Sequence, residues 1–326
     1  MNVAKNPMTS ETQGRGIVLM LLAVMLFIAM DAMVKLLAEG LPIQQIILFR
    51  GLGAFVALLP FVIAAGGLTV LKTKRPMAHL GRVCIGMAGM CFMFLAYKHL
   101  PLADAIAIGF AAPLFMTALS VPLLKESVGA RRWAAVIVGF VGVLVMVPPT
   151  LTIEIGLIFA LLGAVLHAGA MITIRKISAT ENSVSIVFYF TIGCTLFGAA
   201  WMPWVWTPID LATFGMLIGV GIVGGSAQMA MTGALRWTPV AVLGPLEYSA
   251  LVFAMAADYF IWANTPSGQT LIGAVIVMAS GLYIVHRESV RGSRQKFPSR
   301  FARIRIAMAE RDTPPTPTDG PQEPLA

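Results

Sequence analysis

Ten runs of about 20 mostly apolar residues constrain this chain more than any other feature of its sequence. A bilayer core offers no water to backbone polar groups, so a run of this length is stable there as a helix that satisfies its own backbone. The runs are expected at about 16–37, 43–65, 80–97, 101–123, 132–147, 153–174, 184–206, 211–235, 239–262 and 269–285. The sequence therefore predicts an all-α membrane protein with ten transmembrane helices.

Composition supports a membrane protein and excludes several soluble classes. Hydrophobic residues make up 58% of the 326 residues and charged residues 12%, whereas roughly a quarter of a soluble domain is charged. The three cysteines, Cys84, Cys91 and Cys194, lie inside apolar runs and are too few for a disulfide scaffold. The short connections leave no room for a catalytic domain. We expect a lipid bilayer around the chain, no nucleic-acid partner, no metal, no cofactor and no enzyme activity.

The basic residues predict how the chain is oriented. All but three of its 23 Lys and Arg residues flank one alternate set of loops. The exceptions are Lys98, in the opposite set, and Lys35 and Arg50, within apolar runs. Cytoplasmic loops carry the excess of Lys and Arg in membrane proteins. The net charge of +8 is therefore a topology signal, and both termini are predicted to be cytoplasmic.

The two halves of the chain resemble each other weakly. A shift of 140 residues places Gly16 over Gly156 within similar apolar octapeptides, and a shift of 138 places Leu100-Pro-Leu-Ala over Thr238-Pro-Val-Ala. Each half holds five runs, an odd number, so the second half enters the membrane from the opposite face, as inverted repeats do. The predicted parts are a cytoplasmic segment 1–15, a five-helix repeat 16–147, a second five-helix repeat 153–286, and a cytoplasmic tail 287–326 that is basic and then Pro-rich.

Several short motifs occur in an ordered series. They include Asp31-Ala-Met-Val-Lys35, Phe49-Arg50-Gly, Ala103-Asp-Ala-Ile-Ala-Ile-Gly-Phe-Ala-Ala-Pro113 and Gly244-Pro-Leu-Glu-Tyr248. With this topology, the chain resembles the drug/metabolite transporter superfamily, specifically its ten-helix EamA type. It departs from that pattern at Ala263-Asn264-Thr-Pro266, where the family often has a Gly-Glu pair before a proline.

The resemblance implies secondary transport of a small metabolite across the bacterial inner membrane by alternating access. The motifs are most similar to members that move riboflavin or S-adenosylmethionine. Riboflavin uptake is the first expectation. S-adenosylmethionine uptake and amino-acid or opine export by the same fold are the alternatives.

Three ionisable residues lie near one end of the first two runs. Asp31 and Lys35 are one turn apart on one helix face, so they can pair, and Arg50 can complete a network with them. Each such charge needs a partner, a wet cavity or an interface, because a charge near the bilayer centre is costly. A structural clamp between helices remains an alternative to ligand binding by Arg50, whose planar fork suits anionic or amide groups.

Five more residues are candidates for binding or coupling. Glu247 lies deep in the ninth run, after Pro245, and Tyr248 adds a hydroxyl beside it. Phe110 occupies the position that matches Tyr248 in the first half, and both are candidates to stack on a ring-bearing ligand. Gln228 is a candidate cavity residue, and His167 is a candidate for proton coupling. For each of them, packing or silent pairing is the alternative.

Two small-residue spacings, Gly215 with Gly219 and Gly221 with Gly225, predict close helix packing in the eighth run, and they are compatible with a homodimer without establishing one. Two other function classes remain open. A lipid flippase has the same helical character. An intramembrane serine protease would need Ser226 within hydrogen-bond reach of a histidine such as His167.

Overall fold

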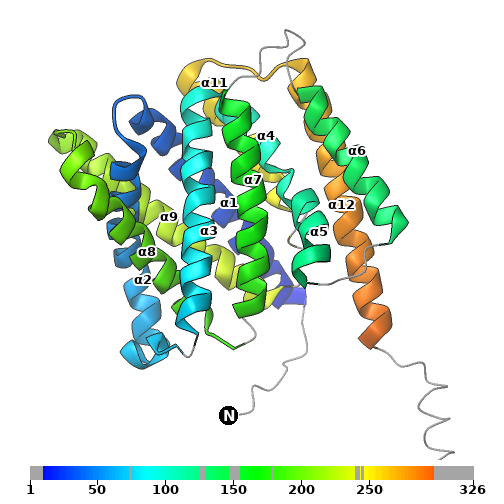
Figure 1. Cartoon of the computed structure of the whole chain (residues 1–326), viewed down its shortest axis with the longest axis horizontal. Helices are drawn as coiled ribbons and strands as arrows, with labels where there is room; N and C mark the ends of the chain where they lie inside the picture. The colour runs from blue at the N-terminus through cyan, green and yellow to red at the C-terminus, as the bar shows by residue number, and fades with distance from the viewer. Residues whose placement is uncertain are drawn as a thin grey trace, which may run out of the picture. The chain divides into compact units, whose positions relative to one another are not determined.

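The computed structural model describes residues 10–73, 75–124, 129–146, 155–177, 180–238, 243 and 246–296, and every regular element among them is helical (Figure 1). The elements are α1 (Ser10–Ala38), α2 (Ile43–Ala64), the 3-10 helix η1 (Gly67–Leu71), α3 (Pro76–His99), α4 (Leu102–Gly109), α5 (Ala112–Leu124), α6 (Ala130–Met146), α7 (Ile155–Ile177), α8 (Ser183–Val205), α9 (Leu211–Trp237), α11 (Ser249–Trp262) and α12 (Gly268–Lys296). The all-helical prediction is confirmed. Residues 1–9 and 297–326, most of the predicted terminal segments, lie outside the described residues, as does Pro245.

Each of the ten predicted runs overlaps at least one of these helices. Among the described residues, seven segments are long and apolar enough to cross a membrane, and two shorter apolar helices cover Ser249–Trp262 and Gly268–Ile284. That all ten runs cross the membrane stays a prediction.

Local chemistry explains where several helices begin. The Asn182 side chain accepts a hydrogen bond from the backbone N–H of Val184 (3.0 Å) at the start of α8. Asp210 does the same for Thr213 (2.9 Å) at the start of α9. Hydrogen bonds from the side chain and backbone of Thr213 hold the pKa of the Asp210 carboxyl below its usual value. Pro76 is the first residue of α3, a position where its missing N–H leaves no bond unmade.

Two of the predicted spans are interrupted. The run 101–123 forms α4 and α5 with a turn at Phe110 and Ala111 between them. Pro113 explains this break, because it has no N–H to donate to the carbonyl of Gly109 one turn earlier. The run 239–262 has a turn at Tyr248 immediately before α11. Both interruptions fall at matching positions of the two halves, since Phe110 and Tyr248 are 138 residues apart.

The main helix contacts within residues 1–284 are paired across the two halves. α3 packs along α7, and α1 packs along α9, which is the same pair with the halves exchanged. The contacts of α4 and α5 with α7 have their counterpart in the contact of α11 with α1. α2 lies against α8, its own counterpart, and α4 lies against α11. Two equivalent halves require this pattern, which supports the predicted repeat.

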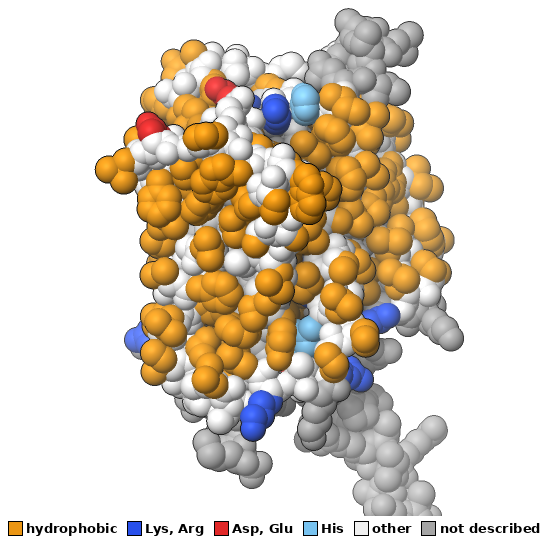
Figure 2. Space-filling model, turned by 60° about the vertical axis from the view of Figure 1, so that its left-hand side comes forward, with side chains coloured by type: hydrophobic (Ala, Val, Ile, Leu, Met, Phe, Trp, Pro, Cys, Tyr) orange, Lys and Arg blue, Asp and Glu red, His pale blue; other side chains and the backbone are white. Residues whose placement is uncertain are grey.

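Side-chain hydrogen bonds identify two ends of this helical body. At the first, here called the Trp262 end, Gln45 of α2 donates to Thr207 O (2.9 Å) and accepts from Thr207 N (3.0 Å). At the second, here called the His79 end, Ser185 and Tyr189 of α8 donate to backbone carbonyls of η1. Figure 2 shows one face of the molecule, with apolar side chains across its middle and charged side chains near both ends. An apolar middle between charged ends fits a bilayer.

Glycines allow α2 and α9 to approach closely. A Cβ atom on Gly53 would lie 2.7 Å from the Cα of Gly221, and a Cβ on Gly225 would meet Ala54 and Ala57. The predicted Gly221–Gly225 spacing therefore packs inside the helical body. Gly215, from the other predicted spacing, has no atom within 4 Å of a Cβ position.

The glycine contact generates a stability prediction. Gly221→Val should destabilise the protein by about 1–3 kcal/mol or more, because the new side chain meets the backbone of α2, which cannot move aside as a flexible side chain can. Thermal unfolding of the purified protein in detergent measures this loss. Gly215→Val on the same helix is the matched control and should leave the melting temperature nearly unchanged. Equal melting temperatures for the two variants would contradict the close approach of α2 and α9.

Candidate functional site

Two arginines meet at one aromatic ring inside the helical body. Arg50 lies on α2 and Arg82 on α3, and both guanidinium groups approach the ring of Phe190 on α8. The distances from the guanidinium carbon to the ring centroid are 4.4 Å for Arg82 and 6.0 Å for Arg50. Such contacts attract a cation to the face of the ring. Two positively charged groups from two helices thus face one aromatic ring on a third helix.

Both guanidinium groups keep unmet hydrogen-bond donors. Nε of Arg50, and Nε and Nη1 of Arg82, are buried without a hydrogen-bond partner in the described part of the chain. A cation–π contact offers attraction but no acceptor atom. Most buried polar groups in proteins have a partner, so these three donors require an explanation.

The carboxylate of Asp31 interacts with one arginine of this pair. The Tyr97 hydroxyl donates to Oδ2 of Asp31 (3.1 Å), and Arg50 interacts with Asp31 electrostatically. The expected Asp31–Arg50 association is therefore present. The expected pairing of Asp31 with Lys35 is not, because the two side chains take partners in different parts of the bundle.

Lys35 instead belongs to a cluster at the Trp262 end. Its Nζ donates to the carbonyl of Leu100 (2.5 Å) and lies 5.0 Å from the centroid of the Trp262 ring. Asp258 of α11 interacts with Lys35 electrostatically, and its two oxygens accept from the backbone N–H groups of Leu102 (3.0 Å) and Ala103 (2.6 Å). This Lys35–Asp258 clamp ties α1, α4 and α11 together and caps the N-terminus of α4.

Several other candidate residues from the sequence interact with one another or with the arginine pair. The rings of Phe110 and Tyr248 are in edge-to-face contact, with centroids 5.0 Å apart, so the two helix interruptions touch each other. Gln228 lines a cavity of about 20 Å³ together with Arg50 and Phe190. His167 interacts electrostatically with Arg82. These contacts join residues from both halves of the chain.

Glu247 stands apart from the arginine pair. It precedes Tyr248 in the chain, its side chain is exposed, and it interacts electrostatically with Tyr248. His167 is likewise exposed. The structure therefore leaves Glu247 available to a ligand or a proton, and it does not join Glu247 to Arg50.

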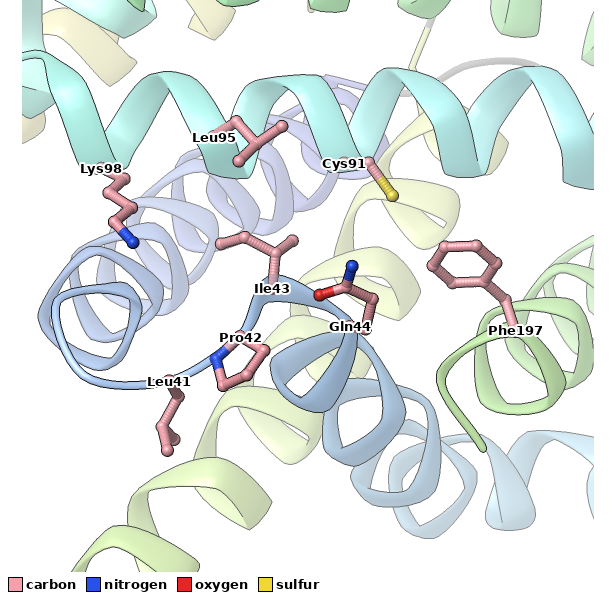
Figure 3. Close-up of a pocket in the computed structure, with 8 residues that line it drawn as sticks. All are labelled: Leu41, Pro42, Ile43, Gln44, Cys91, Leu95, Lys98 and Phe197. Atoms are coloured by element: carbon pink, nitrogen blue, oxygen red, sulfur yellow. The ribbon is translucent and has the colours of Figure 1, made fainter. Parts of the chain in front are cut away.

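A cavity lies at the Trp262 end (Figure 3). It has a volume of about 360 Å³, within the range of small-molecule sites. We call it the vestibule. Its walls come from the start of α2, the second half of α3 and the second half of α8, and they are mostly apolar apart from Gln44 and the exposed Lys98. The lining residues are Leu41, Pro42, Ile43, Gln44, Cys91, Leu95, Lys98 and Phe197.

Sequence reasoning did not single out Arg82, Phe190 or Tyr97 as site residues. The sequence did contain a signal for Arg82, because this residue is a charge inside an apolar run. Its position near one end of the run made it simpler to interpret Arg82 as one of the basic residues that flank a cytoplasmic loop. Phe190 is one of 18 phenylalanines, and no local pattern sets it apart.

The Lys35–Asp258 clamp generates a second stability prediction. Asp258→Ala should cost about 3–5 kcal/mol, because it leaves two N–H groups of α4 and the nearby ammonium group without their acceptor in a buried position. The melting temperature in detergent reports this loss. Asp210→Ala removes a cap at an exposed helix start and should cause a distinctly smaller change. A smaller change at Asp258 than at Asp210 would contradict the clamp.

Comparisons with known proteins agree on one family. A model described as the EamA-like transporter family matches residues 14–147 and 154–286. The chain is 29% identical to an S-adenosylmethionine uptake transporter of Rickettsia bellii, over 87% of this chain and 98% of that protein. It is 28% identical to a pseudopaline exporter of Pseudomonas aeruginosa, over 81% of this chain and 94% of that protein.

Two further matches complete this comparison. The chain is 25% identical to a riboflavin transporter of Vibrio cholerae, over 79% of this chain and 87% of that protein. One solved crystal structure superimposes with a TM-score of 0.59 and 18% identity, covering 82% of this chain and 95% of that chain. That likeness concerns the fold alone.

Proposed function

Because this chain belongs to the EamA-like transporter family, a family of small-molecule transporters, we propose that it carries a small metabolite across the bacterial inner membrane by alternating access. The observation that carries this proposal is the family match over both halves of the chain. The contacts between helices support it, since the strongest of them have counterparts when the halves are exchanged. Two equivalent halves can rock around a site that lies between them.

The proposed topology has ten crossings, inverted repeats and both termini in the cytoplasm. Under this topology, the Trp262 end faces outward and the His79 end faces the cytoplasm. The basic residues of the loops support this orientation. The vestibule then opens toward the outside, while the cavity beside Arg50 and Phe190, at about 20 Å³, has room for no more than a water molecule.

The substrate-binding residues that we propose are Arg50, Gln228, Phe110, Tyr248 and Glu247. Arg50 and Gln228 line the same small cavity. Phe110 and Tyr248 meet at the two helix interruptions. Discontinuous helices commonly frame transporter sites, because they free backbone groups near the midplane. Asp31 and His167 join this proposal as coupling or structural charges, whereas Lys35 is assigned to the clamp.

Two substrates deserve the first test. Riboflavin uptake is the expectation from the sequence motifs. S-adenosylmethionine uptake is the second candidate, and it is favoured by relatives of that name with 28–29% identity over most of the chain. Export, as in the pseudopaline exporter, is the alternative direction.

Proteoliposomes provide the direct experiment. Purified protein is reconstituted, and the initial uptake of labelled riboflavin and labelled S-adenosylmethionine is measured with and without unlabelled substrate inside, so that exchange in either direction is detected. Protein-free liposomes are the control. Saturable movement of at least one solute is the expected result. Movement of a fluorescent phospholipid without movement of any water-soluble metabolite would reject the carrier in favour of a flippase.

A substitution of Glu247 tests the proposed site. Glu247→Gln should lower the initial transport rate about tenfold or more, because it removes the charge of an exposed carboxylate that is available to a ligand or a proton. Asp210→Asn, at an exposed helix start outside the predicted site, is the matched control and should transport normally. A normal rate for Glu247→Gln, at equal reconstituted amounts, would remove Glu247 from the site.

A further inference from the structure

The vestibule and the arginine pair lie along the same three helices. On each helix, the residue at the arginine pair is about 9–14 Å deeper, toward the His79 end, than the residue that lines the vestibule. The corresponding residues are Gln44 and Arg50 on α2, Cys91 and Arg82 on α3, and Phe197 and Phe190 on α8. The vestibule and the two guanidinium groups therefore lie at different depths along the same three helices.

The charge around the pair is unbalanced. Two guanidinium groups face Phe190, and Asp31 contributes one carboxylate, which already accepts from Tyr97. Uncompensated charge in an apolar interior is costly, so a site of this kind is stabilised when an anion enters it. The excess of one positive charge matches a monoanion better than a dianion.

The free donors suit an oxyanion such as a carboxylate. Nε and Nη1 of Arg82 lie on the same planar group, and Nε of Arg50 is the third unmet donor. Guanidinium groups bind carboxylates through paired N–H···O bonds, which an ammonium group cannot reproduce. The Phe190 ring beside them offers an apolar surface to the rest of a ligand. Lys98 at the vestibule adds a cation that attracts anions toward the entrance.

We propose that Arg50 and Arg82 together bind a carboxylate of the transported metabolite beside Phe190, and that this ligand enters through the vestibule. The inference rests on the proposed function, because it names the chemistry of the ligand in the same site. The cavity of about 20 Å³ at Arg50 cannot admit a carboxylate as it stands. The helices around Phe190 must therefore separate when the ligand binds, as alternating access requires. S-adenosylmethionine carries a carboxylate, together with an ammonium and a sulfonium group, whereas riboflavin carries no carboxylate, so only the former can make this contact.

Matched pairs of ligands test the carboxylate directly. Purified full-length protein in detergent is titrated with S-adenosylmethionine and its decarboxylated analogue, and with nicotinate and nicotinamide, while the melting temperature is followed. At least one carboxylate should bind about tenfold or more tightly than its partner. Arg50→Gln and Arg82→Gln should each bring that ratio close to one. Arg75→Gln, an exposed arginine just before α3, is the control and should keep the ratio.

Two controls show whether a loss of binding comes from misfolding. They are the Arg82→Lys variant and size-exclusion chromatography of every variant. The lysine variant keeps the charge and loses the fork, so it should fold and bind the carboxylate with intermediate affinity. Equal binding of both members of every pair, stabilisation by no carboxylate, or an unchanged ratio in both glutamine variants would overturn the inference. Stabilisation by phosphatidylglycerol vesicles alone would also overturn it, because the anion would then be a lipid headgroup.

The transport assay distinguishes failure of the carboxylate site from failure of the proposed transport function. Saturable riboflavin transport that is unaffected by Arg50→Gln and Arg82→Gln would leave the carrier intact and reject the carboxylate site. Absence of transport for every solute, together with carboxylate binding that depends on both arginines, would leave the site intact and reject the carrier.

Discussion

Polar groups in the apolar body of this protein need partners other than water, and the arrangement of its helices depends on that requirement. Helices satisfy most of the backbone internally, but each interruption exposes a few N–H and C=O groups. The start of α4 shows how they are satisfied. The buried carboxylate of Asp258 accepts its first two N–H groups, and the ammonium of Lys35 donates to the carbonyl of Leu100. Polar side chains on other helices thus allow α4 to begin inside the bundle.

The arginine pair is the opposite case. Asp258 and Lys35 have protein partners, whereas Arg50 and Arg82 retain three buried donors and share an aromatic ring that accepts no hydrogen bond from them. A structural role alone would favour partners for these donors, because unmet buried donors weaken the fold. The proposed ligand, which enters and leaves, would explain why the partners are not built into the chain. This contrast separates a structural cluster from the proposed binding site among residues that look alike in the sequence.

The two halves share an architecture without sharing all of their chemistry. Phe110 and Tyr248 occupy equivalent interruptions and touch each other. Asp258, however, corresponds to Ser120 in the first half, and the Ser120 hydroxyl donates within its own helix to Thr117 O (2.8 Å). Ser120 carries no charge, whereas Asp258 is a carboxylate. Such a difference can bias a symmetric carrier toward one of its two conformations, since a buried charged cluster at one end costs more to open.

Apolar length, basic loops and the repeat were readable from the sequence, because they depend on local composition and on shifts along the chain. These features predicted an all-helical membrane protein, and the ordered motifs gave the resemblance to the family that the comparisons identify. The sequence also marked Arg50, Asp31 and Phe110 as unusual. It did not predict that Lys35 turns away from Asp31, that Arg82 and Phe190 join Arg50, or that Asp258 caps a helix more than 150 residues away. Partner choice among buried charges depends on which helix faces come together, and only the tertiary packing of the helices decides that.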